Sequence, residues 1–346
     1  MADENVWQVA RRVSGSRARP APSTRLTPSS KQRLGRIVRK SPEVMVKVTG
    51  RSFGPGHLKA HLDYVTRNGS LIAIGGDGRT IESRPELRSL HDEWVLKNEL
   101  ATCRRDEKSA SAVHLMLSMP PQTDREAVEH AASAWAANIL GDRHDYILTR
   151  HDDQGHPHVH VTVRAVGYDG RRLRVDRDDL QTWREHFAEK LRERGIDAEA
   201  TPRKARGRTL KADRHAVRQL KDRGVVPRVE LEARREVARE ARMGKADVKA
   251  WETRIAGHRE NVRAAYASHA TELEAGSDND RQLARDIRRF VADMPVAHTR
   301  RQLLQDELLA ATKRGRPAPD REAPNPVDLQ SMSEPKRPDR DVEPER

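Results

Sequence analysis

The chain has little of the chemistry that cross-links small secreted proteins or anchors proteins in membranes. It contains one cysteine, Cys103, in 346 residues, which excludes an intramolecular disulfide and any metal site built from several cysteines. No run of residues approaches the roughly 18 apolar positions of a membrane-spanning helix, and the N-terminus lacks the apolar core of a signal peptide. We therefore expect a cytoplasmic protein without membrane insertion.

The chain also has few residues for building a hydrophobic core. Aromatic residues make up 3% of it and hydrophobic residues 35%. Both fractions are low for one large globular core of this length. The composition therefore predicts a folded part of roughly 150–200 residues, with long polar flanks that are helical or disordered.

What the chain has in excess is positive charge. Lys and Arg number 66 against 53 Asp and Glu, and the formal net charge is +13. Such an excess favours polyanionic partners, of which nucleic acid is the commonest. Charge alone does not separate a DNA-binding protein from a ribosome-bound or membrane-surface protein, so the assignment depends on motifs.

Composition and periodicity divide the chain into four parts. Residues 1–41 are rich in Arg, Ser and Pro and predict a basic flexible arm. Residues 42–200 follow the order β-α-ββ-α-β-α-ββ-α, which predicts an α+β domain with a central, mostly antiparallel sheet flanked by helices. Residues 201–315 predict a basic, charged helical region, and residues 316–346 a disordered tail.

One tyrosine lies on the polar side of a predicted helix. The helix spans residues 57–67 and buries a stripe made of Leu58, Leu62 and Val65. Tyr64 lies off this stripe, so its hydroxyl is free to meet a ligand. A phenol has a pKa of about 10 and needs a base or a nearby cation to act as a nucleophile. Such a tyrosine is usually just a half-exposed helix residue, so a catalytic interpretation depends on a second feature.

The segment HDDQGHPHVHVTV supplies that second feature. His158 and His160 alternate along a predicted strand and therefore project from one face, where neutral imidazoles can chelate a divalent metal. His151, before the turn, can supply a third ligand from the partner strand, although His156 shares the parity of the strand pair and remains an alternative. Asp153 is placed to hydrogen-bond a ligand imidazole. A histidine-rich surface turn is the competing interpretation.

Two segments resemble the MobA/VirD group of mobilisation relaxases, a MOBP-like part of the HUH endonuclease superfamily. GHLKAHLDYVTRNG resembles their tyrosine motif, and HDDQGHPHVHVTV resembles their histidine motif, HxDxxHPHxH. The order of the two motifs is the same, and the resemblance covers residues 42–170. It implies that Tyr64 is the nucleophile, that His151, His158 and His160 hold a metal, and that Asp153 orients a ligand or assists proton transfer.

Residues expected to contact DNA come from several sources. The resemblance implies a serine near the DNA, and Ser118 is its match. Arg164 departs from the family, which often has Asn there. The basic segment 203–223 and the N-terminal arm would contact phosphates without reading sequence. The full set of expected contacts is Ser118, His156, Arg164, Arg203, Lys204, Arg206 and Arg208.

The resemblance implies a metal-dependent relaxase. Such an enzyme nicks one strand at a plasmid transfer origin by tyrosine transesterification and leaves a 5′-phosphotyrosine adduct, for conjugative transfer or mobilisation. Its cofactor would be Mg or Mn, with Zn or Ni as substitutes in vitro. Its partners would be single-stranded and hairpin DNA at the origin, with accessory mobilisation proteins and a type IV secretion coupling protein as further candidates. Bound to DNA, it could also pass into a recipient cell.

Two alternatives remain at this point. A rolling-circle replication initiator shares the histidine pair but places its catalytic tyrosine after the histidines, where this chain has Tyr168 and Tyr266. A non-enzymatic DNA-binding accessory protein would bind metal without forming a covalent adduct. The position of the tyrosines discriminates the first alternative, and adduct formation discriminates the second.

Overall fold

A computed structural model describes most of the chain. The described ranges are 26–101, 109–153, 155–210, 213–244, 248–296 and 298–313. Cys103, the first 25 residues and the expected tail from residue 316 lie outside them. The chain forms two compact units, Met1–Arg208 with Thr253–Ala297, and Thr209–Glu252 with His298–Arg346.

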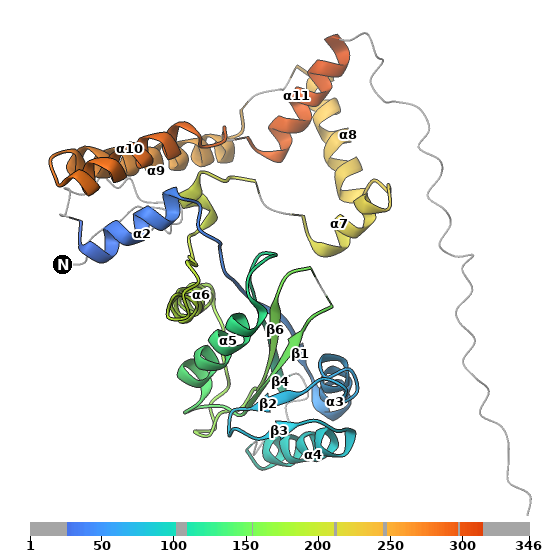
Figure 1. The fold of residues 1–346 in the computed structure, drawn as a ribbon. Coiled ribbons are helices and arrows are strands. Elements are labelled where there is room, and N and C mark those ends of the chain that lie inside the picture. Colours follow the sequence, from blue (N-terminus) through green and yellow to red (C-terminus); the bar gives the residue numbers. More distant parts are fainter. Residues whose placement is uncertain are drawn as a thin grey trace, which may run out of the picture. The chain divides into compact units, whose positions relative to one another are not determined.

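A six-stranded sheet forms the centre of the first unit (Figure 1). Its strands are β1 (Met45–Ser52), β2 (Ala73–Gly75), β3 (Thr80–Ile81), β4 (Ala112–Ser118), β5 (Tyr146–His151) and β6 (His158–Arg164). They lie in the order β1-β4-β6-β5-β2-β3, and every neighbouring pair is antiparallel. The expected α+β class with an antiparallel sheet is confirmed.

Helices cover both faces of this sheet (Figure 1). One face carries α3 (Gly54–Val65) and α4 (Arg84–Ala101), and the other carries α5 (Arg125–Leu140) and α6 (Arg177–Arg192). Side chains alternate along a strand, so β4 sends Leu115 into the core beneath α5 and α6. Its neighbours on the opposite face point toward the α3 layer.

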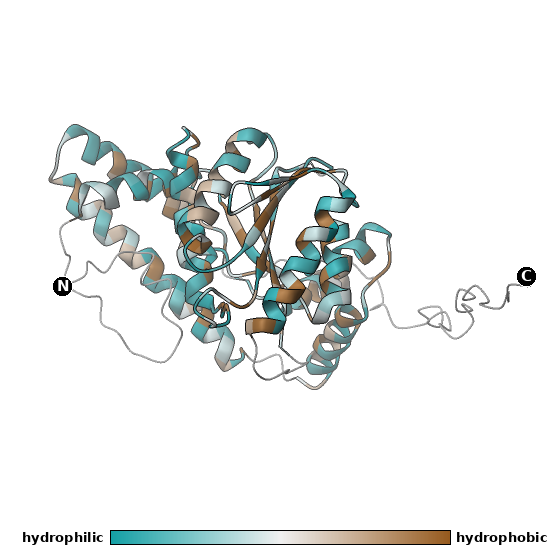
Figure 2. Cartoon of the chain, turned by 90° about the horizontal axis from the view of Figure 1, so that it is seen from below, coloured by the Kyte–Doolittle hydropathy of each residue, from teal (hydrophilic) through white to brown (hydrophobic). Residues whose placement is uncertain are grey.

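The apolar pattern explains this arrangement. The strands of the sheet are the most continuously apolar part of the unit, whereas the helices carry apolar stripes between hydrophilic faces (Figure 2). On the α5–α6 side, Trp135 and Trp183 meet edge to face with ring centroids 5.6 Å apart. The Trp135 Nε1–H donates to the Trp183 carbonyl over 3.0 Å, so the buried polar atom is satisfied.

Two helix boundaries show how local sequence fixes the elements. Thr123 is typical of a helix N-cap, but Asp124 is the cap of α5 and accepts a hydrogen bond from the Ala127 amide. The Thr123 hydroxyl instead donates to the Pro120 carbonyl over 2.9 Å. At the other end of the domain, α6 is followed by Gly195 at φ +77°, a left-handed conformation that favours glycine.

The expectation of a flexible arm over residues 1–41 is wrong for one segment. Residues 28–38 form α2 (Pro28–Val38), capped by Thr27, and bury Leu34 and Ile37. These side chains pack in one apolar cluster with α9 (Ala250–Glu274) and α10 (Asp278–Ala292). Two apolar residues three positions apart were enough to form a helical stripe once partner helices covered them.

The second unit is helical and rich in ion pairs. Its helices are α7 (His215–Asp222), α8 (Arg228–Arg242) and α11 (Arg300–Lys313). Glu230 forms ion pairs with Lys221 at 2.7 Å and with Arg300 at 2.8 Å. Within the described part of the chain, no helix has the length and apolarity to span a membrane.

Candidate active site

The three histidines expected to bind metal lie together on the α3 side of the sheet. In the β5–β6 register His151 is opposite His158, and His160 is two residues further along the same face. Their ring centroids are 4.4 to 5.4 Å apart. One ring nitrogen from each lies within 4.8 Å of the others. The antiparallel register therefore creates the cluster.

On two of these rings, His151 and His158, one nitrogen is hydrogen-bonded to a backbone carbonyl. The His151 Nε2 lies 2.6 Å from the Val65 carbonyl, and the His158 Nδ1 lies 3.2 Å from the His156 carbonyl. Each ring therefore donates to a carbonyl and keeps its other nitrogen as an acceptor, which is how metal-bound histidines are usually held. The His160 Nδ1 is buried and has no hydrogen-bond partner among the described residues. This donor set fits a divalent metal.

Burial keeps two of these imidazoles, His158 and His160, neutral, as metal binding requires. Burial lowers the pKa of His158. Burial, and then the neighbouring His151 and His158, lower the pKa of His160 to about 3. At neutral pH these two rings therefore offer lone pairs without first losing a proton.

His156 and Asp153 lie beside the cluster rather than in it. The His156 ring centroid is 5.3 Å from that of His158, but the three ring nitrogens that converge belong to the other histidines. One Asp153 carboxylate oxygen is 4.0 Å from the His151 Nδ1, and the other forms an ion pair with Arg67. Asp153 is therefore anchored by Arg67 and faces the His151 Nδ1 without hydrogen-bonding it.

Tyr64 is in the last turn of α3, next to the residue that is hydrogen-bonded to the histidine cluster. Val65, whose carbonyl accepts the His151 hydrogen bond, is the following residue. The Tyr64 side chain is 59% exposed, so its hydroxyl is accessible to a ligand. The Arg67 guanidinium carbon is 5.8 Å from the centroid of its ring. One end of α3 therefore brings a tyrosine, a cation and the histidine cluster to the same place.

A second histidine pair anchors α3, and its role was not evident from the sequence. His61 and His114 stack with ring centroids 3.2 Å apart. The His61 Nε2 is 3.0 Å from the Thr162 hydroxyl, and the His114 Nε2 is 2.9 Å from the Ser52 hydroxyl. Burial lowers the pKa values of His61 and His114 to about 3 and 4, so both are neutral. The only sequence signal was the spacing of three between His61 and Tyr64.

Comparison with known proteins agrees with this geometry. Residues 81–196 match the relaxase family described as the MobA/VirD2-like nuclease domain. This stretch is a MobA/VirD2-like relaxase nuclease domain. The match contains all three histidines of the cluster and begins after Tyr64. Tyr64 therefore lies outside the residues that the family match covers.

Two curated relatives carry the same kind of domain. A T-DNA border endonuclease VirD2 from Rhizobium radiobacter is 29% identical over 161 residues, which cover 42% of this chain and 38% of the relative. A second VirD2, from Agrobacterium fabrum, is 25% identical over 198 residues, covering 54% of this chain and 42% of the relative. The chain therefore spans about two fifths of the length of these relatives.

The other tyrosines of the chain are poorly placed for catalysis. Tyr266 is fully buried, its hydroxyl donates to the Ala205 carbonyl, and burial raises its pKa. Tyr168 is exposed but follows the far end of β6, roughly 20 Å along the strand from His158. Its hydroxyl donates to Asp145 over 3.1 Å. Tyr146 is buried in the core.

The expected DNA contacts divide by exposure. Arg164 is buried and forms an ion pair with Asp145 at 2.6 Å. It is therefore a structural residue, and the expectation that it contacts DNA is wrong. Ser118 is buried opposite His158 on β4, inside the site rather than on its surface. Arg206 is half-buried and pairs with Glu43 at 3.3 Å. Arg203, Lys204 and Arg208 are exposed.

Proposed function

We propose that the chain is a metal-dependent DNA relaxase that nicks one strand at a plasmid transfer origin through Tyr64. The observation that carries the proposal is the His151 hydrogen bond to Val65, because it joins the histidine cluster to the end of α3 that bears Tyr64. An exposed phenol beside a cluster of three histidines is suited to nucleophilic attack on a phosphodiester. The family match and the VirD2 relatives support DNA as the substrate.

The reaction exchanges one phosphodiester for another. The Tyr64 oxygen attacks phosphorus, the bond from phosphorus to the 3′-oxygen breaks, and the phenolic proton leaves as the 3′-oxygen gains one. The products are a 5′-phosphotyrosine and a free 3′-hydroxyl. Because no water enters the reaction, the ester energy is retained and the strand can be rejoined.

His151, His158 and His160 would hold a divalent cation, Mg or Mn in the cell. When bound, such a cation withdraws charge from the non-bridging oxygens of the scissile phosphate. Arg67 adds a positive charge beside Tyr64 and holds Asp153 in place through their ion pair. Asp153 faces His151 and is the residue we assign to orient that ligand or to accept a proton.

The proposal includes the partners that a transfer relaxase needs. These are single-stranded and hairpin DNA at the origin, accessory mobilisation proteins and a type IV secretion coupling protein. Arg203, Lys204 and Arg208 are exposed cations that can contact phosphates without reading sequence. We place the protein in the cytoplasm, from which it would travel to a recipient cell while attached to DNA.

A cleavage assay tests the proposal. The full chain is incubated with single-stranded DNA from its own transfer region and Mn, and products are separated on a denaturing gel. We expect one cleavage position and a protein–DNA adduct, both abolished by EDTA and restored by added Mn. Undiminished cleavage after exhaustive dialysis against EDTA would overturn the metal-dependent mechanism. Metal binding without any adduct would instead indicate a non-enzymatic accessory protein.

A further inference from the structure

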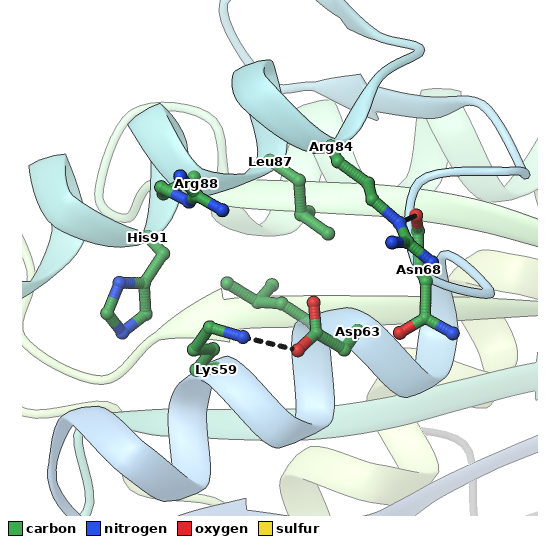
Figure 3. A pocket seen from close by; sticks show the side chains of 8 residues that line it. Lys59, Asp63, Asn68, Arg84, Leu87, Arg88 and His91 are labelled. Carbon is green, nitrogen blue, oxygen red and sulfur yellow. Dashed lines mark hydrogen bonds and ion pairs between the residues drawn. The ribbon is translucent and has the colours of Figure 1, made fainter. Parts of the chain in front are cut away.

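A cationic pocket lies between α3 and α4, on the flank of the helix that carries Tyr64 (Figure 3). Its volume is about 170 Å³. Figure 3 shows Lys59 and Asp63 on α3 facing Arg84 and Arg88 on α4. The lining residues are Lys59, Leu62, Asp63, Asn68, Arg84, Leu87, Arg88 and His91. Three permanent cations and one carboxylate thus surround an apolar floor.

Most of this positive charge is not neutralised within the protein. Lys59 pairs with Asp63 at 2.9 Å. Arg84 donates from Nε to the Asn68 carbonyl over 3.1 Å, which satisfies hydrogen bonding but not charge. Arg88 is exposed, and its side chain has neither a hydrogen bond nor an ion pair with any described residue. Two guanidinium groups therefore keep their charge for an external anion.

Two neighbouring cations are, in contrast, neutralised within the protein. Further along α4, Lys97 pairs with Glu93 at 2.7 Å, and Arg79 pairs with the same carboxylate at 2.8 Å. Arg84 and Arg88 are instead four residues apart on one helix, a spacing at which like charges destabilise the helix by a few tenths of a kcal/mol. A bound anion between them would remove that repulsion.

Two residues that line the pocket flank Tyr64 in the sequence. Asp63 precedes Tyr64 directly, and Asn68 belongs to the turn that follows it. A strand whose scissile phosphate is at Tyr64 passes this flank of α3 within a few nucleotides, since an α-helix with its side chains is only about 10 Å across. We infer that the pocket binds a backbone phosphate of the DNA strand being nicked. The inference rests on the proposed DNA substrate and adds a site to it.

Equilibrium binding to the full chain in EDTA tests the site without requiring cleavage. The probes are fluorescein-labelled oligo-dT and a fluorescein-labelled blunt DNA hairpin, measured by anisotropy over a range of salt concentrations. The variants are the Arg84→Gln, Arg88→Gln double substitution, and Asp63→Asn. The control is Arg171→Gln, because Arg171 is 89% exposed in a turn away from the pocket.

The two pocket variants should change affinity in opposite directions. Loss of one single-strand phosphate contact lowers the salt slope by about 0.7, so the affinity deficit of the double variant relative to the wild type should shrink about 2.6-fold between about 50 and 200 mM salt. Asp63→Asn removes the repelling carboxylate and frees Lys59, so oligo-dT should bind more tightly. A folding defect would not strengthen binding in this way. The Arg171→Gln control should bind like the wild type.

The outcomes separate this inference from the proposed function. If the double variant binds both probes with the affinity and salt slope of the wild type, the pocket does not bind a backbone phosphate and the inference is wrong. An effect on the hairpin alone would also overturn it, because the site would then hold duplex rather than the strand at Tyr64. If the double variant loses oligo-dT binding but the wild type never forms an adduct, the pocket stands and the relaxase proposal fails.

Discussion

At the scale of single residues, His151 and His156 provide a matched pair for testing the metal cluster. Both flank the β5–β6 turn, but only the His151 ring converges with His158 and His160. His151→Ala should therefore weaken Mn binding by more than the roughly tenfold typical of losing a residue that merely supports a ligand. His156→Ala should weaken it less, since the His158 ring bonds to the backbone carbonyl at 156, which remains.

Calorimetric titration of both variants with Mn decides between the two histidines. A larger loss of affinity for His156→Ala than for His151→Ala would mean that the third ligand comes from the same strand as His158. The assignment of His151 across the hairpin would then be wrong.

The residue scale also shows where prediction from sequence ends. The strand parity of His158 and His160 was enough to predict that they share one face, because alternation is a local property. Arg164 shares that parity, but its burial depends on Asp145, a partner 19 residues away. The stacking of His61 on His114 joins a helix to a strand much later in the chain. Such partners follow from the fold and not from spacing.

At the scale of elements, Asp145 is the strongest test of how the adjoining ends of β5 and β6 are held. It pairs with Arg164 at the end of β6 at 2.6 Å and with Lys97 of α4 at 3.2 Å. Asp145→Asn leaves a buried guanidinium without its counter-charge, so we expect a loss of about 2–3 kcal/mol in the free energy of unfolding. Asp169→Asn is the control, because its pair with Arg171 is exposed and should be worth under about 1 kcal/mol.

The Asp145 effect should depend on pH in one direction. Burial would raise the Asp145 pKa, but the hydrogen bond and charge of Arg164, with Lys97, outweigh burial and hold the pKa below its usual value. A lowered carboxylate pKa contributes stability above the unfolded value of about 4, and that stability is lost as the pH falls through the folded value. Urea unfolding should therefore show a constant gap between wild type and variant near neutral pH that narrows below about pH 4. A gap that widens in acid would contradict the ion pair.

Elements with strong periodicity were predictable, and those that depend on distant partners were not. The stripe of Leu58, Leu62 and Val65 predicted α3, and these residues are buried. In contrast, α2 has only two large buried apolar positions, and its burial depends on α9 and α10, far later in the chain. A sequence window cannot contain that contact, so a flexible arm was the natural expectation.

At the scale of the whole molecule, helices beyond residue 208 should stabilise α2 near the start of the described chain. A chain ending at residue 208 lacks α9 and α10 and exposes Leu34 and Ile37, each worth about 1.5–3 kcal/mol when buried. It should melt at a lower temperature and bind more of a hydrophobic dye than the full chain. A chain ending at residue 297 keeps the first unit and should lack this defect. Equal melting temperatures for the two truncations would contradict the packing of α2.

The central claim is that Tyr64 becomes covalently attached to DNA, and peptide mapping of the adduct tests it most directly. Wild-type protein is incubated with single-stranded DNA from its transfer region and Mn, digested with trypsin and nuclease, and measured by mass spectrometry. We expect a nucleotide phosphate on the peptide that contains Tyr64, its loss in Tyr64→Phe, and its retention in Tyr168→Phe. A phosphorylated peptide containing Tyr168, or an adduct of normal yield in Tyr64→Phe, would contradict the assignment.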